Sequence, residues 1–134
     1  LVFNVGLFTL TLYVTKTEVL TKELFGDRFE FTKIDSLTMT VDNFPKGLDV
    51  VFVDGGHSKE CAMNDLNLCH QLKVPFIVLD DTETDSVAST FRKFNAEHDG
   101  LYSIVNYCRY FPSKGPAKTE NHNAKVTLIR RNDV

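Results

Sequence analysis

The stretch LDVVFVDGGHSKE, from Leu48 to Glu60, decides the fold that this chain is expected to adopt. A run of apolar and β-branched residues ends abruptly in Asp-Gly-Gly-His, and Ser58, a residue type that caps helices, follows. Apolar residues that run without polar alternation are typical of a strand buried on both faces, as in a parallel sheet covered by helices. The stretch therefore predicts a buried strand, a glycine turn and a helix, in that order.

A second stretch, VPFIVLDD from Val74 to Asp81, repeats this pattern and ends in two aspartates. Pro75 stands near its start, where a missing backbone donor is tolerable. A further helix is expected from about Asp85, with Gly100 beyond its end. Because a strand, a helix and a second strand in succession form a right-handed parallel unit, both strands should end at the same edge of one sheet.

The flanking segments extend this α/β pattern. The apolar residues 1–5 predict another strand, Thr15 to Glu18 has the spacing of a capping box before a helix that Gly26 ends, and residues 28–36 predict a strand near the sheet edge. Two strand-like runs after residue 100, separated by a polar Pro/Gly loop, predict a C-terminal antiparallel hairpin. We expect one α/β domain over residues 1–134, with a mostly parallel sheet and helices on both faces.

Composition narrows the functional classes. The chain has 134 residues, 43% of them hydrophobic and 25% charged, which is ordinary for one globular domain. Its formal charge of −3 lacks the basic excess of a phosphate-binding surface, so we expect no nucleic-acid partner. No apolar run approaches the roughly 20 residues of a membrane span, so no membrane partner is expected. The three cysteines cannot all pair, which favours a reducing, cytoplasmic location.

Acidic residues stand where the predicted strands end. In open parallel sheets, ligands bind beyond the carboxyl ends of the strands, and Asp35, Asp54, Asp80 and Asp81 fall at such ends. Carboxylates brought together repel each other unless protons or a cation relieve the repulsion. Oxygen ligands of this kind suit a divalent ion such as Mg²⁺. Taken singly, Asp35 or Asp81 could equally cap a helix.

The glycine turn after residue 54 has two interpretations. Gly55 and Gly56 either let a ligand approach the backbone closely or serve a tight turn that needs positive φ. His57 would then stand at the mouth of the site, where an imidazole can accept a proton near neutral pH. An exposed turn histidine with no role is the equal alternative.

Three of these stretches resemble a known family. FGDRFEFTKIDS, LDVVFVDGGHSKECAMNDL and PFIVLDDTETD, followed by the hairpin, resemble the class I S-adenosylmethionine-dependent methyltransferases. The resemblance is greatest to the small-molecule O-methyltransferase branch, whose motifs read Asp-Gly-x-His-x-Tyr-Glu and Asp-Asp. It implies a Rossmann-like fold, S-adenosylmethionine as cofactor, Mg²⁺ in metal-dependent members, and a small-molecule substrate that is methylated on a hydroxyl.

The resemblance also implies roles for individual residues. His57 matches a residue near the reacting centre, where it could take the proton of the acceptor hydroxyl. The implied metal ligands are Asp54, Asp80 and Asp81. The implied cofactor contacts are Asn4, Asp35, Ser36, Asp54 and Gly55, of which Asp35 and Ser36 would lie beside the adenine.

The chain also departs from the family pattern. Asn4 stands where an acid usually binds the ribose hydroxyls, Ile34 replaces a usual glycine, and Lys59 replaces a frequent tyrosine. The family's first strand, with its Gly-rich cofactor turn, has no counterpart here. We expect the sequence to be part of a longer methyltransferase, with a shortened, degenerate relative as the alternative, and in either case to be inactive alone.

Three other functional classes compete with methyl transfer. A noncatalytic α/β module that binds a protein or a metabolite is the chief one, although such a module has no need to cluster acids at strand ends. A phosphoacceptor receiver domain has its Asp pair first in the chain, whereas here Asp54 precedes Asp80 and Asp81. A metal-dependent phosphoesterase would require more histidines at strand ends than His57 alone.

Overall fold

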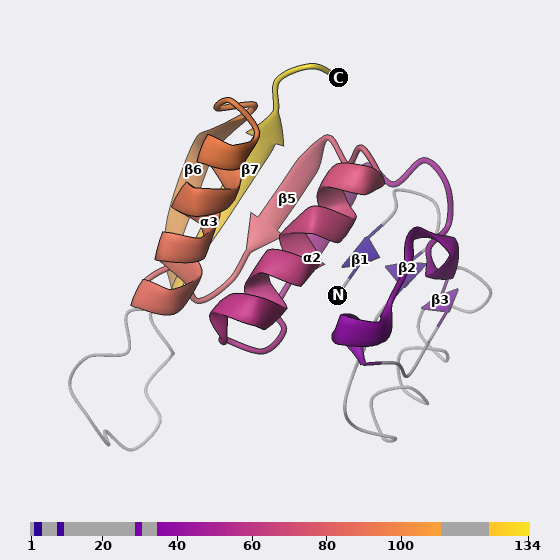
Figure 1. The fold of residues 1–134 in the computed structure, drawn as a ribbon, viewed down its shortest axis with the longest axis horizontal. Helices are drawn as coiled ribbons and strands as arrows, with labels where there is room; N and C mark the ends of the chain where they lie inside the picture. The colour runs from indigo at the N-terminus through magenta and orange to yellow at the C-terminus, as the bar shows by residue number, and fades with distance from the viewer. Residues whose placement is uncertain (1, 4–7, 10–28, 31–34, 111–123) are drawn as a thin grey trace.

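Two parallel strands and the helix between them form the centre of the fold. A computed structural model describes residues 2–3, 8–9, 29–30, 35–110 and 124–134 of the chain. Strand β4 (Val50–Val53) pairs in parallel with β5 (Phe76–Leu79), with Val53 opposite Leu79, and helix α2 (Lys59–Gln71) connects them. The strand–helix–strand unit predicted from the two aspartate-ended stretches is confirmed (Figure 1).

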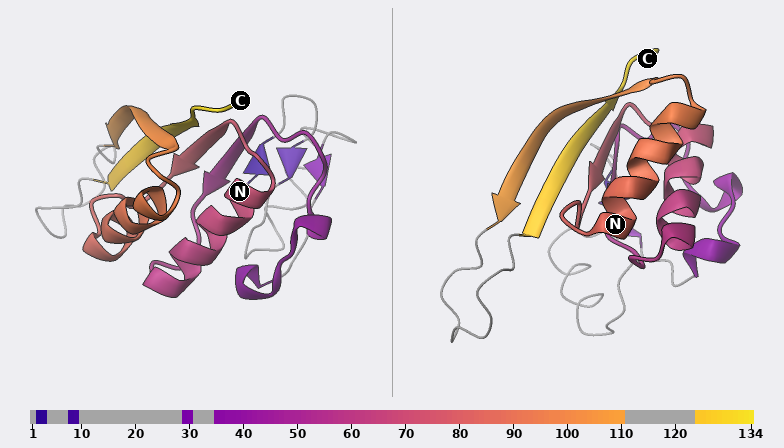
Figure 2. Two further views of the ribbon diagram at one scale, coloured as in Figure 1. Left: turned by 45° about the horizontal axis from the view of Figure 1, so that its top comes forward. Right: turned by 60° about the vertical axis from the view of Figure 1, so that its left-hand side comes forward.

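The two described helices begin and end as their sequences predict. The Ser58 hydroxyl accepts a hydrogen bond from the backbone N–H of Cys61 at 3.1 Å and so caps α2. Helix α3 (Asp85–Glu97) is followed by Gly100, whose φ of +70° suits a residue without a side chain. Both helices lie against the same face of the sheet (Figure 2). The helix predicted between Thr15 and Gly26, on which the expectation of helices on both faces depends, lies outside the described residues.

Among the described residues, the sheet has seven strands in the order β3-β2-β1-β4-β5-β7-β6. The C-terminal hairpin of β6 (Tyr102–Tyr110) and β7 (Ala124–Arg131) is antiparallel, as predicted, and β7 pairs antiparallel with β5. Strand β2 (Phe8–Thr9) pairs in parallel with β3 (Phe29–Glu30). The α/β class is therefore confirmed, but the sheet is mixed rather than mostly parallel.

The amino-terminal strand explains part of this difference. Strand β1 (Val2–Phe3) pairs antiparallel with β4, Val2 lying opposite Val51, and antiparallel with β2. The resemblance put the family's first, parallel strand beside β4. In this chain β1 lies there in antiparallel orientation and pairs with backbone donors and acceptors along that edge of β4.

The core lies between the sheet and the two helices. Phe94, Leu66, Ile77, Leu79, Ile129 and Val74 are all less than 2% exposed. They come from α2, α3, β5, β7 and the turn before β5, so all of these elements share one apolar layer. The core thereby fixes the position of the β4 and β5 ends, where the acidic residues stand.

The other end of the sheet carries a histidine cluster. The rings of His70 and His98 stack with centroids 3.8 Å apart, and His70 Nδ1 lies 2.9 Å from the Tyr102 hydroxyl. Burial, together with the charges of His98 and Arg131, lowers the pKa of His70, whereas Asp133 opposes this shift. Burial raises the pKa of Tyr102 to about 12, so its hydroxyl stays protonated beside a neutral imidazole.

This cluster predicts a pH-dependent stability. Since the folded pKa of His70 is lowered, the unfolded chain binds a proton more readily, and stability should fall as the pH drops below about 6.5, the unfolded imidazole value. His70→Asn, which keeps a polar atom near the Nδ1 position, should flatten the dependence. Thermal unfolding between pH 5 and pH 8 measures both proteins. Identical slopes would show that His70 does not contribute.

Candidate functional site

The carboxyl ends of β4 and β5 bring the predicted acids to one edge of the sheet. Asp54 follows β4, and Asp80 and Asp81 follow β5. The backbone N–H of Asp80 donates to the carbonyl of Val53 at 3.0 Å, which extends the parallel ladder to the last residue before the acids. The aspartates therefore start from neighbouring backbone positions.

Three side chains converge at this edge. Asp54, His57 and Asp81 each offer one donor atom, and these atoms all lie within 4.8 Å of one another. His57 Nε2 and Asp81 Oδ2 lie 2.5 Å apart. The His57 side chain is 54% exposed and that of Asp81 is 25% exposed, so the group is open to solvent and to a ligand.

The turns around this group hold it in place. The Ser86 hydroxyl, near the start of α3, donates to the His57 carbonyl at 2.7 Å and ties the β4–α2 turn to α3. Asp81 has a φ of +51°, a left-handed conformation that aspartate tolerates better than most residues. Its carbonyl accepts from the N–H of Thr84 at 2.9 Å, which closes the turn before α3.

Asp80 lies beside the group but is used differently. Its Oδ1 accepts a hydrogen bond from the N–H of Asp81 at 2.9 Å, so this carboxylate helps to form the turn. The converging group contains His57 and does not include Asp80. Of the three predicted metal ligands, the structure brings together Asp54 and Asp81.

The electrostatics of the group are dominated by negative charge. Burial raises the pKa of Asp81, and the neighbouring acids Asp80, Glu83 and Asp54 raise it further, although His57 acts in the opposite direction. An ionised Asp81 is therefore costly without a cation. Two carboxylates and an imidazole are also the donor types that divalent metals accept, and the described residues fit such an ion.

The predicted adenine contacts lie on a separate turn. Asp35 caps the short helix η2 (Ser36–Thr38), and its side chain accepts from the N–H of Leu37 at 3.1 Å. The carbonyl of Ser36 accepts from the Asn64 side-chain amide of α2 at 2.6 Å. Asn4 lies outside the described residues.

Asp65 of α2 is a residue of this region that the sequence interpretation missed. The Ser36 hydroxyl donates to its carboxylate, and burial raises its pKa. A Cβ on Gly55 would lie 2.7 Å from Asp65 Oδ2, so a side chain at residue 55 would require this carboxylate to move. Neither Gly55 nor Gly56 has a positive φ. Helical spacing could have revealed Asp65, since it lies three residues after the buried Ala62 and four before the buried Cys69.

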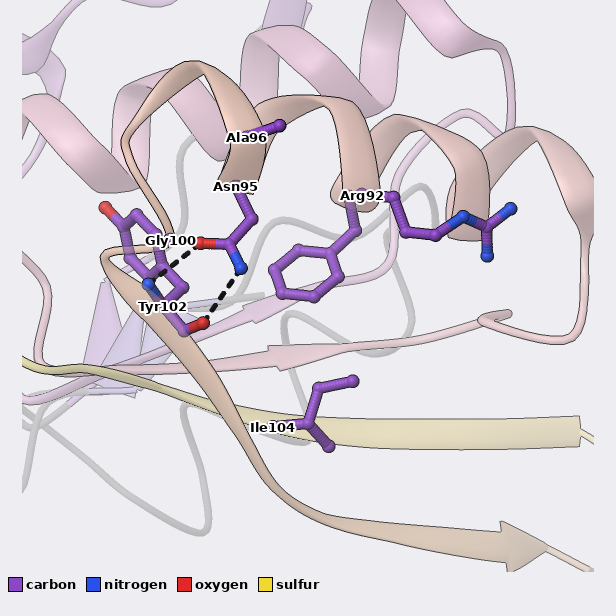
Figure 3. Close-up of a pocket in the computed structure, with 7 residues that line it drawn as sticks. Arg92, Asn95, Ala96, Gly100, Tyr102 and Ile104 are labelled. Atoms are coloured by element: carbon purple, nitrogen blue, oxygen red, sulfur yellow. Dashed lines mark hydrogen bonds between the residues drawn. The ribbon is translucent and has the colours of Figure 1, made fainter.

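A hollow of about 470 Å³ lies elsewhere, beside the carboxyl-terminal half of α3 (Figure 3). Asn95 forms two hydrogen bonds of 2.9 Å with the backbone of Tyr102 and so holds the end of α3 against the start of β6. The hollow is mainly apolar and remote from Asp54 and Asp81, which lie at the other end of α3. Its lining residues are Phe91, Arg92, Asn95, Ala96, Gly100, Tyr102 and Ile104.

Within the described ranges, neither α2 nor α3 has the length and apolar character to cross a bilayer.

Comparison with solved structures identifies the fold. A candidate rRNA-methylase from Clostridium thermocellum superposes with a TM-score of 0.61 at 15% identity, over 92% of this chain and 71% of that chain. The human methyltransferase 10 domain containing protein superposes with a TM-score of 0.56 at 11% identity, over 94% of this chain and 60% of that chain. The chain has a methyltransferase fold. No protein-family model matches it, and no curated protein matches its sequence.

These likenesses confirm part of the predicted resemblance and correct another part. The class I methyltransferase fold is confirmed, whereas the small-molecule O-methyltransferase branch stays a prediction. The expectation of no nucleic-acid partner is wrong. It rested on the net charge of −3, and the same fold occurs in a candidate rRNA-methylase, so that charge does not exclude nucleic acid.

The raised pKa of Asp81 predicts that the Asp81→Asn substitution stabilises the fold without a cation and removes the stabilisation that a cation provides. Because the folded pKa is raised, ionised Asp81 destabilises the fold at neutral pH, and Asp81→Asn should raise the melting temperature in cation-free buffer. Mn²⁺ should then stabilise the unmodified protein, by about 2.7 kcal/mol at 100 times its Kd, and not the variant.

Asp99→Asn is the matched control, because Asp99 has nearly the same backbone conformation, with φ of +52°, at the far end of α3. Thermal unfolding with EDTA and with Mn²⁺ measures all three proteins. A cation-induced shift in Asp81→Asn equal to that in Asp99→Asn would contradict the assignment.

Proposed function

We propose that this chain is the catalytic-site portion of an S-adenosylmethionine-dependent methyltransferase that acts on a hydroxyl group with the help of a divalent cation. The observation that carries the proposal is the convergence of Asp54, His57 and Asp81 at the carboxyl ends of two parallel strands. Ligands bind at this edge in open α/β sheets, and the fold is shared with two methyltransferases.

The chemistry requires alignment and proton removal more than covalent help. The acceptor oxygen forms a bond to the methyl carbon, the bond from that carbon to sulfur breaks, and its electron pair stays on sulfur. A divalent ion held by Asp54 and Asp81 would lower the pKa of the acceptor hydroxyl. His57, with a half-exposed imidazole whose Nε2 donates to the Asp81 carboxylate, would accept the hydroxyl proton at Nδ1.

The chemical types of the available ligand atoms favour some divalent metals over others. Mg²⁺, the ion implied by the resemblance, takes oxygen ligands, and Asp54 and Asp81 supply carboxylate oxygens. If His57 were a third ligand, its nitrogen would favour Mn²⁺ or Zn²⁺ over Mg²⁺. We assign His57 as the base and not as a ligand, which makes Mg²⁺ and Mn²⁺ the expected ions.

Two classes of methyl acceptor can be compared directly by experiment. The resemblance implies a small molecule with hydroxyl groups, and the name of the Clostridium thermocellum protein indicates rRNA. Both carry hydroxyl oxygens that a cation at Asp54 and Asp81 could bind. Transfer of a radiolabelled methyl group to small polyhydroxylated compounds and to ribosomal RNA distinguishes them.

A degenerate module is the second candidate, and β1 favours it. In the resembled family the Gly-rich turn that holds the cofactor follows a strand next to the counterpart of β4. Here β1 occupies that side of β4 in antiparallel orientation. We therefore propose that residues 1–134 alone are inactive. The methyltransferase proposal expects a form extended upstream to bind the cofactor, and the degenerate-module alternative expects that it does not.

Calorimetric titration of S-adenosylmethionine tests the proposal. We expect a Kd of roughly 1–100 μM for a form extended upstream, with and without Mg²⁺, and weak or no binding by residues 1–134. Absence of binding in both forms would favour the degenerate module and reject methyl transfer.

The His57→Gln substitution distinguishes a role of His57 as general base from a role as metal ligand. As a general base, His57 should contribute about 10²–10⁴-fold to the transfer rate, so the variant should lose this factor while its Mn²⁺ affinity changes less than about twofold. Asp80→Asn is the control, because its amide oxygen can still accept from the Asp81 N–H. A large loss of Mn²⁺ affinity in His57→Gln would show that His57 is a ligand.

A further inference from the structure

Residues Asn64 and Asp65 of α2 connect the two turns that border the proposed cofactor crevice. The Asn64 side-chain amide donates to the Ser36 carbonyl at 2.6 Å. The adjacent Asp65 carboxylate accepts from the Ser36 hydroxyl and lies against Gly55, in the turn after β4. Two consecutive side chains of one helix thus reach both the Asp35–Ser36 turn and the Asp54–Gly55 turn.

We infer that Asn64 and Asp65 are positioning residues that set the spacing between these two turns and so shape the adenine side of the cofactor site. The inference rests on the proposed function and extends it to residues for which the family resemblance gave no role. The Asp35–Ser36 turn is short and Asp35 is exposed, so the turn has little packing of its own to fix its position.

Local contacts do not replace this connection. The hydrogen bonds inside η2, from Thr38 N to Asp35 O at 2.9 Å and from Met39 N to Ser36 O at 3.2 Å, define the shape of the turn. They do not attach it to the rest of the protein. Among the described contacts, the bonds of Ser36 to Asn64 and Asp65 provide that attachment, across 28 residues of sequence in the case of Asn64.

The glycine at position 55 supports the same inference from the other side. Asp65 Oδ2 is so close to Gly55 that a Cβ there would have to displace it. The carboxylate is also held by Ser36, so its displacement would disturb both turns together. Gly55→Ala should therefore act on cofactor binding in the same direction as removal of Asn64.

The test compares Asn64→Ala with Asn67→Ala, a matched substitution on the same helix at a residue with no contact to η2 among the described interactions. In the unmodified protein, ¹⁵N relaxation should give order parameters of about 0.85 for Leu37 to Met39. They should fall below about 0.6 in Asn64→Ala and stay unchanged in Asn67→Ala.

S-adenosylmethionine affinity in the extended form should fall about tenfold in Asn64→Ala alone, which is the effect of one lost hydrogen bond. Mn²⁺ affinity should stay equal in all three.

Unchanged order parameters in Asn64→Ala would overturn the inference, and so would a mobile turn with unchanged cofactor affinity. Asn64→Asp, which keeps the side-chain shape and removes the donor, must behave like Asn64→Ala, and wild-type behaviour of this variant would also overturn it. If the unmodified extended form binds no cofactor, the proposed function fails and the cofactor part of the inference fails with it. The relaxation data, which need no cofactor, still decide whether Asn64 holds the turn.

Discussion

The parallel pairing of β4 with β5 is the constraint on which the candidate site depends. Because both strands run in the same direction and Val53 lies opposite Leu79, the residues that follow them must emerge at one edge of the sheet. The hydrogen bond from Asp80 N to Val53 O carries this alignment one residue further. The apolar layer of α2 and α3 against the sheet keeps the strands in register, so the position of the acids is a consequence of the core.

The same constraint creates an electrostatic problem. Burial and, to a smaller extent, the neighbouring carboxylates raise the pKa of Asp81, and His57 compensates only in part. The Asp81 turn also uses a left-handed backbone conformation that most residues adopt at a cost. Natural proteins retain carboxylates in such an unfavourable cluster mainly at sites that bind or react. The cation-binding role that we propose for this edge would compensate the excess negative charge.

The parallel unit of β4, α2 and β5 could be predicted from the sequence, whereas the pairing of β1 could not. The uninterrupted apolar runs ending at Asp54 and Asp80, with Ser58 as a helix cap, predicted the parallel unit because periodicity and capping are local properties. The antiparallel pairing of β1 with β4 could not be predicted, since it depends on which strands are present to compete for that edge. Within the site, Asp54 and Asp81 converge as expected. The turn geometry that directs Asp80 to the Asp81 N–H, and the Asp65 carboxylate beside Gly55, both depend on tertiary contacts that spacing alone does not reveal.

The central claim is that the ends of β4 and β5 form one cation site from Asp54 and Asp81, beside His57. Anomalous diffraction from a crystal grown with Mn²⁺, recorded above and below the manganese absorption edge, tests it most directly. We predict one strong anomalous peak within about 2.0–2.6 Å of a carboxylate oxygen of Asp54 and of one of Asp81. A well-ordered edge with both carboxylates visible and no peak between them, or a peak only at another acidic group, would contradict the account.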